Sequence, residues 1–380
     1  MSEKKLKKAA QIIVKAGMLP FPITDTLLEI VDLLYSDDEL DFIIRAFKRR
    51  SSQTMEQLKN TTGLKEEDIL NYVDSLAEKG ALFNQPSSSG LMVYRLLPLI
   101  FVGIFEYCFM QKIEYNEKEK ELAVFFDKLF DEIRDVIQER YDTFLPVFRN
   151  IPPIDRTIPV KENLSGKEIT ISVNEEIEAP EERVLLTTDI EKLIDKFDDI
   201  AVGYCFCRQH QDLLGNSCQI TDMRENCFTF GKSARFVSEN GFGRLISKEE
   251  ALKILIESEN EGLVHKAYHP FGKRDRDETS VCNCCKDCCG TFNLWKKGVL
   301  PMINYTNFLS QIDQELCVGC GTCVEKCPVD AIQINESDKA ERNPDWCIGC
   351  GICAHFCPES AISLIEGDRT VYVPPPKIRE

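Results

Sequence analysis

The feature that most constrains this chain is a cysteine pattern that occurs twice near the C-terminal end. The two copies read CVGCGTCVEKCP, at 317–328, and CIGCGICAHFCP, at 347–358. In each copy the cysteines follow the spacing C-x2-C-x2-C-x3-C, and a proline comes directly after the last one. Three thiols at such short intervals can surround one centre only if the backbone turns tightly, and the glycines between them allow that turn. Each copy is therefore predicted to form a metal-binding loop.

The spacing and the proline resemble those of bacterial two-cluster ferredoxins, over about 308–370. The resemblance implies two [4Fe-4S] clusters, each bound by three cysteines of one copy and by the last cysteine of the other. The implied ligands are Cys317, Cys320, Cys323 and Cys357 for cluster 1, and Cys347, Cys350, Cys353 and Cys327 for cluster 2. The alternating stretches AIQIN and AISLI that follow the two copies predict short strands. A pair of zinc ribbons is the alternative, but zinc sites usually use two separated cysteine pairs.

The middle of the chain contains a second, less regular set of cysteines. Of the 18 cysteines in 380 residues, nine fall within 186–300, and Cys108 is alone in the first 185 residues. The nine form a candidate additional metal site: Cys205, Cys207, Cys218, Cys227, Cys282, Cys284, Cys285, Cys288 and Cys289. A C-x-C pair in extended chain points both thiols to one face, and C-x2-C is a common chelating spacing, so Cys205/Cys207 and Cys285/Cys288 are the natural pairs. Cys108 is expected to pack in a hydrophobic core.

Three interpretations of the middle set remain open. The leading one is one or more additional iron-sulfur clusters; the second is a zinc site; the third is a redox-active dithiol or disulfide at a vicinal pair. A disulfide framework is not expected, since 43% apolar residues suffice for an ordinary core and the N-terminus lacks a secretory signal. His265 and His269 are candidate ligands or proton donors, with packing at a helix end as the simpler interpretation. No glycine-rich nucleotide-binding loop is found.

The first part of the chain has helical periodicity, and 54–96 follows the order helix, turn, helix, hairpin. Over about 50–110 the chain resembles winged-helix domains. The basic stretch RAFKRR at 45–50 favours DNA binding. Against it, the second helix begins with Lys65-Glu66-Glu67-Asp68, and the net charge of the chain is −17. We therefore expect this region to dock protein or to pack internally, and nucleic acid is not an expected partner. The apolar segment 91–110 is predicted to be a buried helix, because its longest uncharged run is far too short for a membrane span.

Together these patterns predict an α+β multidomain protein. We expect a helical, winged-helix-like docking region at 1–150, a linker at 151–185, a cysteine-rich α/β metal domain at 186–300, a ferredoxin-like 2[4Fe-4S] domain at 301–370, and a tail at 371–380 that is loose or binds a partner. The expected function is electron transfer in the cytoplasm of an anaerobe, as a ferredoxin-type relay or an oxidoreductase component with redox protein partners, rather than a stand-alone enzyme. The alternatives are an oxidoreductase with a catalytic cluster in the middle domain and a redox-sensing winged-helix regulator that binds DNA.

Overall fold

The computed structural model describes residues 2–17, 22–87, 89–172, 189–269 and 277–378. The chain divides into two compact units. Unit 1 comprises 1–136, 203–217 and 232–245, and unit 2 comprises 137–202, 218–231 and 246–380. The predicted middle domain is therefore shared between the units, whereas the linear domains of the sequence placed it in one. Most of the predicted acidic linker, at 173–184, lies outside the described residues.

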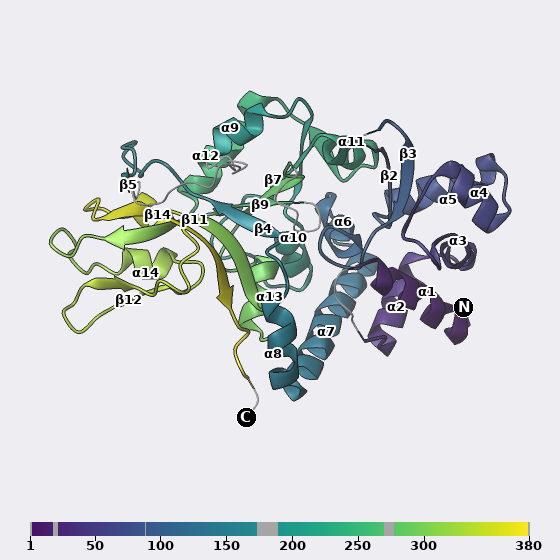
Figure 1. Ribbon diagram of the computed structural model, residues 1–380, viewed down its shortest axis with the longest axis horizontal. Helices are drawn as coiled ribbons and strands as arrows, with labels where there is room; N and C mark the ends of the chain where they lie inside the picture. Colours follow the sequence, from purple (N-terminus) through teal and green to yellow (C-terminus); the bar gives the residue numbers. More distant parts are fainter. Residues whose placement is uncertain (1, 18–21, 88, 173–188, 270–276, 379–380) are drawn as a thin grey trace. The chain divides into compact units, whose positions relative to one another are not determined.

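Unit 1 is built mainly of helices around one small sheet (Figure 1). Its elements are α1 (Glu3–Ala16), α2 (Asp25–Leu34), α3 (Asp37–Phe47), β1 (Ser52–Gln53), α4 (Met55–Thr62), α5 (Glu66–Glu78), β2 (Leu82–Pro86), β3 (Met92–Leu96), α6 (Ile104–Met110), most of α7 (Glu117–Glu139), α10 (Phe206–Leu213), α11 (Lys232–Glu239) and β8 (Gly243–Leu245). Capping boxes at Ser36 and Thr54 begin α3 and α4. The strands are antiparallel in the order β1-β3-β2. This element order agrees with the pattern read at 54–96, and the winged-helix assignment itself stays a prediction.

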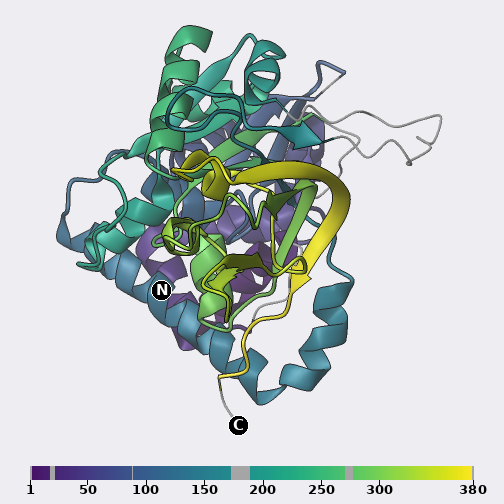
Figure 2. The ribbon, with the colours of Figure 1, turned by 90° about the vertical axis from the view of Figure 1, so that its left-hand side faces the viewer.

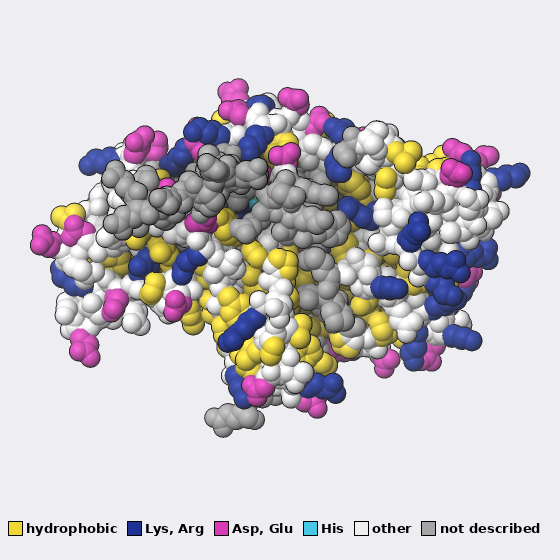
Figure 3. All heavy atoms as spheres, viewed as in Figure 1, with side chains coloured by type: hydrophobic (Ala, Val, Ile, Leu, Met, Phe, Trp, Pro, Cys, Tyr) yellow, Lys and Arg dark blue, Asp and Glu magenta, His cyan; other side chains and the backbone are white. Residues whose placement is uncertain are grey.

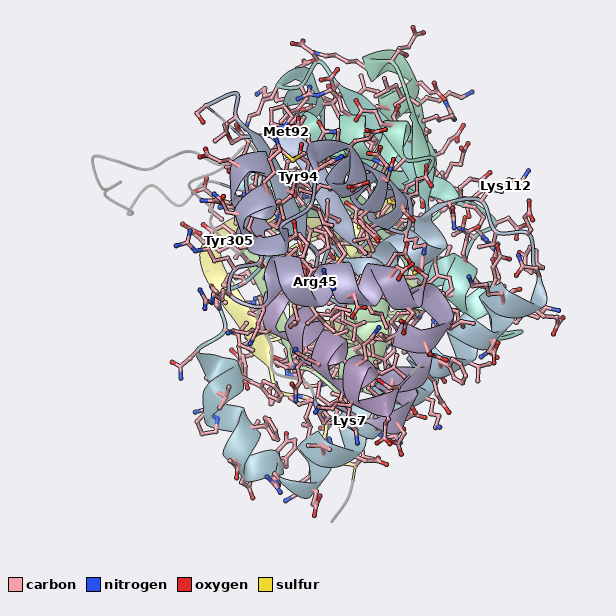
Figure 4. All side chains as sticks on the ribbon, turned by 90° about the vertical axis from the view of Figure 1, so that its right-hand side faces the viewer. Lys7, Arg45, Met92, Tyr94, Lys112 and Tyr305 are labelled. Carbon is pink, nitrogen blue, oxygen red and sulfur yellow. The ribbon has the colours of Figure 1, made fainter. Side chains whose placement is uncertain are left out.

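The segment 91–110 is not the single buried helix that its hydropathy predicted. Residues Met92–Leu96 form β3, in which Tyr94 is buried and Met92 is exposed. Figure 4 labels both side chains. Pro98 follows the strand, and a Cβ on Gly103 would overlap the carbonyl oxygen of Pro98. Glu106 then accepts hydrogen bonds from the backbone N–H groups of Phe101 and Gly103, at 2.8 and 3.0 Å, and α6 begins. The apolar run is thus divided because its buried residues alternate before Pro98 and recur at helical spacing after it.

Unit 2 is organised around a large mixed sheet. Its elements are α8 (Tyr141–Arg149), β4 (Asp155–Ile158), β5 (Ile171–Ser172), α9 (Ile190–Asp195), most of β6 (Ile200–Tyr204), β7 (Glu225–Phe230), α12 (Lys248–Asn260), β9 (Val264–Tyr268), β10 (Ser280–Cys284), α13 (Gly290–Lys296), β11 (Met302–Ile312), α14 (Thr322–Lys326), β12 (Ile332–Ile334), β13 (Ala340–Arg342), α15 (Ile352–His355) and β14 (Ile362–Val373). Among the described residues of unit 2, the strand order is β5-β14-β11-β4-β9-β10-β7-β6, and the chain passes between the units within β6. The hairpin β12-β13 is separate.

The ferredoxin-like region and the cysteine-rich middle segment share this sheet. Strands β11 and β14 flank the two cysteine motifs and pair along an antiparallel ladder from Met302↔Val373 to Ile312↔Ile362 (Figures 1 and 2). β11 also pairs in parallel with β4, and the order then continues through β9 and β10 to β7. The strand order thus runs without a break from the ferredoxin-like region through β4, which lies in the predicted linker, to the strands of the cysteine-rich segment.

Buried charged residues tie the centre of this sheet together. Lys266 on β9 is fully buried, and its Nζ lies 2.6 Å from a carboxylate oxygen of Asp155 on β4. Asn304 on β11 donates to the same carboxylate at 2.7 Å, and Arg156 pairs with the buried Glu278 at 2.5 Å. Isolated charges are costly inside a protein, so each of these buried charged groups needs its partner. The contacts of Lys266 and Asn304 thereby connect β4 to β9 and to β11.

Candidate metal centres

Four cysteines from both motifs line one pocket. Cys317, Cys320 and Cys323 come from the loop before α14 and from its first turn, and Cys357 lies two residues after the end of α15. Cys317 and Cys323 are buried, Cys357 is half-buried and Cys320 is exposed. The two loop glycines, Gly319 and Gly321, have φ values of +69° and +80°, which only glycine adopts readily. The structure therefore brings together the four residues that the sequence resemblance implied for cluster 1.

A second pocket contains the other four motif cysteines, which are all buried. They are Cys327, Cys347, Cys350 and Cys353, and Ser310 of β11 lies beside them. Cys327 belongs to the first motif, so the last cysteine of each motif crosses to the pocket of the other. The ligand assignments themselves remain predictions.

Hydrogen bonds to sulfur are arranged alike in the two pockets. The backbone N–H of Ala331 donates to Cys327 Sγ at 3.2 Å, and that of Ala361 donates to Cys357 Sγ at 3.3 Å, each four residues after the cysteine. Further contacts join Ala340 N to Cys317 Sγ at 3.4 Å and Ser310 Oγ to Cys347 Sγ at 3.6 Å. Such donors stabilise thiolate charge and tune an iron-sulfur centre. The donor set in both pockets thus fits a four-thiolate cluster.

Burial dominates the acidity of these thiols. Burial, with nearby Cys317 and Cys320, raises the pKa of Cys323 to about 11. Burial also raises the pKa of Cys350 and of Cys353 well above that of a free thiol, with the neighbouring sulfurs as the second cause. Cys320 is the contrary case, because a hydrogen bond with Thr322 lowers its pKa. Adjacent buried thiolates repel one another, so the sets are compatible with ionised sulfur when a cationic metal core balances them.

The middle cysteines of unit 2 separate into two groups. In the first, the Sγ atoms of Cys218, Cys285 and Cys288 all lie within 4.8 Å of one another, and the three residues are buried. The Sγ atoms of Cys218 and Cys285 are 3.7 Å apart, and the backbone N–H of Cys288 donates to Cys285 Sγ at 3.1 Å. This group contains the expected chelating pair, Cys285/Cys288, and adds Cys218 from the loop before β7.

The second group lies on β10 and at the start of α13. Cys282 and Cys284 are two residues apart on β10 and so share a face of the sheet, and Cys227 on β7 is the direct cross-strand partner of Cys282. Hydrogen bonds with Cys282 and Cys289, followed by burial, raise the pKa of Cys284 well above its usual value. The register of β10 against β7 brings Cys227 opposite Cys282, and a linear sequence does not reveal that register.

Cys205 and Cys207 belong to unit 1 and are both buried. The extended geometry expected for this pair does not occur, because α10 begins at Phe206 directly after Cys205. The reason is local: β6 ends at Tyr204, and Cys205 is the N-cap of the helix. The structure thus places these two residues at a strand-to-helix turn in a different unit from the other seven middle cysteines.

The two candidate histidines are held by the scaffold. The buried His265 has its Nδ1 2.6 Å from Asn283 Oδ1 and its Nε2 3.0 Å from Glu259 Oε1, and His269 Nε2 lies 3.9 Å from Glu278 Oε1. These contacts favour the structural role over metal binding.

Sequence reasoning did not identify Lys266 as a residue near the cysteines. Burial by itself lowers the pKa of Lys266, but the negative charges of Asp155, Cys284 and Cys289 outweigh burial and raise it above its usual value.

Two pockets, each with three cysteines from one motif and the crossing cysteine of the other, define a ferredoxin-type domain. Residues 310–364 match the family described as "4Fe-4S dicluster domain", which confirms the resemblance found in the sequence. Within the described residues, we find no helix with the length and hydropathy needed to cross a bilayer. No solved structure matched the chain significantly.

Similarity to curated proteins is confined to short segments. The chain is 57% identical over 30 residues to an iron-sulfur subunit of the CoB–CoM heterodisulfide reductase of Methanopyrus kandleri, which covers 8% of this chain and 5% of that protein. It is 42% identical over 61 residues to one subunit of an ion-translocating oxidoreductase complex of Methanosarcina acetivorans, covering 16% and 22%. It is 39% identical over 59 residues to the translation initiation factor RLI1 of Saccharomyces cerevisiae, covering 15% and 10%. The chain thus spans less than a quarter of each of these relatives.

Proposed function

We propose that this protein transfers electrons through two [4Fe-4S] clusters in its C-terminal region, as a component of a larger redox system. The observation that carries the proposal is the pair of four-cysteine pockets, in which the last cysteine of each motif lines the pocket of the other. Two of the similar proteins are named as subunits of a reductase and of an oxidoreductase complex, which supports a redox role. Three middle cysteines, Cys227, Cys282 and Cys284, lie on strands of the same sheet, which supports a route between the clusters and that region.

The proposed ligands are those implied by the sequence. Cys317, Cys320, Cys323 and Cys357 would hold cluster 1, and Cys347, Cys350, Cys353 and Cys327 would hold cluster 2. A bound [4Fe-4S] cluster supplies one-electron chemistry at a potential set by burial and hydrogen bonding. The four cysteines of the second pocket are buried, and the N–H groups of Ala331, Ala340 and Ala361 donate to the sulfur atoms of Cys327, Cys317 and Cys357.

The surface beside Cys320 is the proposed contact for a redox partner. Cys320 is the exposed member of its set, and it is accompanied by two large apolar side chains, Leu316 and Val318, which are 53% and 62% exposed. Exposed apolar side chains beside a redox centre suit a transient protein interface. Electrons would therefore enter or leave through cluster 1, while the more buried second pocket serves as the inner position.

For the N-terminal region we propose protein docking. The first turn of α5 contains Glu66, Glu67 and Asp68, and both signs of charge are visible on the face of unit 1 in Figure 3. Carboxylates at the start of a helix repel phosphate groups, so this surface fits a protein better than DNA. Specific DNA binding that survives 0.2 M salt, measured by fluorescence anisotropy, would contradict this proposal.

The crossed ligand assignment can be tested on anaerobically purified, full-length protein. Iron and sulfide analysis should give at least about eight of each per chain if both clusters are present. Cys320→Ser and Cys357→Ser should alter the same EPR signal, and Cys327→Ser should alter the other. Cys108→Ser is the matched control, because Cys108 lies in α6 of unit 1. If Cys357→Ser and Cys353→Ser instead affect one common signal, the crossed assignment is wrong.

A further inference from the structure

The first middle group has the dimensions of a site for a single metal ion. Zinc binds thiolates at about 2.3 Å in tetrahedral geometry, which places two sulfurs of one site about 3.8 Å apart. The observed separation between the Sγ atoms of Cys218 and Cys285 is 3.7 Å. A four-iron cube holds its ligands around an inorganic core of several atoms, and the two ferredoxin-type pockets provide that room between their thiols.

We propose that Cys218, Cys285 and Cys288 bind one zinc ion, at a site separate from any iron-sulfur cluster. The three sulfurs converge in a buried environment with Leu263, and with Ile220 and Met223 packed against it. Three protein ligands in a tetrahedral site leave a fourth position for water or an incoming ligand, as in catalytic zinc sites. The inference goes beyond the proposed electron transfer and does not depend on it.

The local backbone positions these ligands before metal binds. A turn at 286–288 follows β10, and the N–H of Cys288 donates to Cys285 Sγ, which fixes the spacing of the pair. The backbone N–H of Gln219 donates to Asp287 Oδ2 at 2.8 Å, which fastens the loop of Cys218 to this turn. Asp287 Oδ2 also lies 3.5 Å from Cys288 Sγ. Asp287 is therefore a positioning residue beside the site, and it does not belong to the group of mutually close ligand atoms.

The two vicinal cysteine pairs are divided between the groups. Cys284 contacts Cys282 and Cys289, whereas Cys285 contacts Cys218 and Cys288. Adjacent residues at the end of a strand point to opposite faces, which explains why Cys284 and Cys285 serve different groups. The same division separates Cys288 from Cys289. The sequence CNCCKDCC thus contributes Cys285 and Cys288 to the proposed zinc site, and Cys282, Cys284 and Cys289 to the second group. A disulfide within either vicinal pair would draw a thiol away from its group.

The test is metal analysis combined with zinc X-ray absorption on the full-length, anaerobically purified protein. We expect about one zinc per chain with three sulfur neighbours at about 2.3 Å and one lighter neighbour. Cys285→Ser and Cys288→Ser should each remove that zinc while the iron content and the EPR signals stay unchanged. Cys282→Ser is the matched control from the second group and should retain the zinc. Asp287→Ala should retain the fold, judged by circular dichroism, and bind zinc more weakly in competition with a chelator.

Three outcomes would overturn the proposal. Loss of about four iron in Cys285→Ser would make the group part of a cluster. Loss of zinc in Cys282→Ser would show that the two groups form one centre. A wild-type protein without zinc that takes up no added Zn²⁺ after anaerobic incubation would show that the three thiols do not bind this ion. A change confined to the ferredoxin-type EPR signals would instead concern the electron-transfer proposal, so the two failures are distinguishable.

Discussion

Gly319 offers a sharp test of how the first cluster loop is built. Its φ is +69°, and a Cβ at this position would come far closer to the carbonyl oxygen of Asp338 than the 3.0 Å limit that real Cβ contacts observe. Gly166 has nearly the same φ, +72°, but a Cβ there would meet nothing within 4 Å. Both residues lie in unit 2, so a comparison of alanine variants at the two positions distinguishes the effect of backbone strain from that of steric overlap.

Gly166→Ala should cost only the strain of a left-handed alanine, about 1–2 kcal/mol. Gly319→Ala carries the same strain and must also displace the backbone at Asp338, which adds about 1–3 kcal/mol, as overpacking does elsewhere. The displacement has a second effect, because Ala340 lies two residues beyond Asp338 and its N–H donates to Cys317 Sγ. Gly319→Ala should therefore also disturb the environment of cluster 1.

Anaerobic urea denaturation followed by circular dichroism measures the two losses, and EPR with iron analysis reports on the cluster. We expect Gly319→Ala to lose more stability than Gly166→Ala by about 1–3 kcal/mol and to change one EPR signal. Equal losses in the two variants, with both EPR signals unchanged, would refute the argument from steric overlap.

Three further changes test the scaffold. Lys266→Met leaves the buried Asp155 carboxylate without its cation, so it should lower the free energy of unfolding by about 3–5 kcal/mol. If the unpaired carboxylate is the cause, the double variant Lys266→Met/Asp155→Asn should lose less stability than the single variant. Burial raises the pKa of Glu39, but hydrogen bonds from Lys79 and Ser75 outweigh burial and lower that pKa below 4.5. The ionised Glu39 carboxylate therefore stabilises unit 1 above pH 4.5, and this contribution is lost as the pH falls. Glu39→Gln should make the free energy of unfolding of unit 1 less dependent on pH in this acidic range. Gln138 donates to the carbonyls of Gly298 and Pro376 at 2.8 and 3.1 Å and accepts from the N–H of Ile378, so Gln138→Ala should speed proteolysis of the C-terminal segment, and an unchanged cleavage rate would contradict this contact.

That C-terminal segment illustrates the limits of local reasoning. Its prolines predict that neither helix nor strand continues, and the sequence alone favoured a loose or partner-binding tail. In the structure, the carbonyls of Pro374 and Pro375 accept hydrogen bonds from Trp295 and Tyr141. Residues that lack N–H groups still have carbonyl acceptors, and side chains distant in sequence supply the donors. The segment is therefore packed within unit 2 through Ile378.

The sequence by itself determined the ferredoxin-type region, because its signal is local: thiols at fixed short spacings, glycines at the positions of positive φ, and prolines after the crossing cysteines. Only the tertiary structure decided how the other cysteines are grouped. Their association depends on the register of β10 against β7, on which face of β10 each thiol occupies, and on a loop more than sixty residues away that brings in Cys218. These are pairings between distant segments, and residue spacing alone carries no information about them because a shift of one residue in register reverses every side chain.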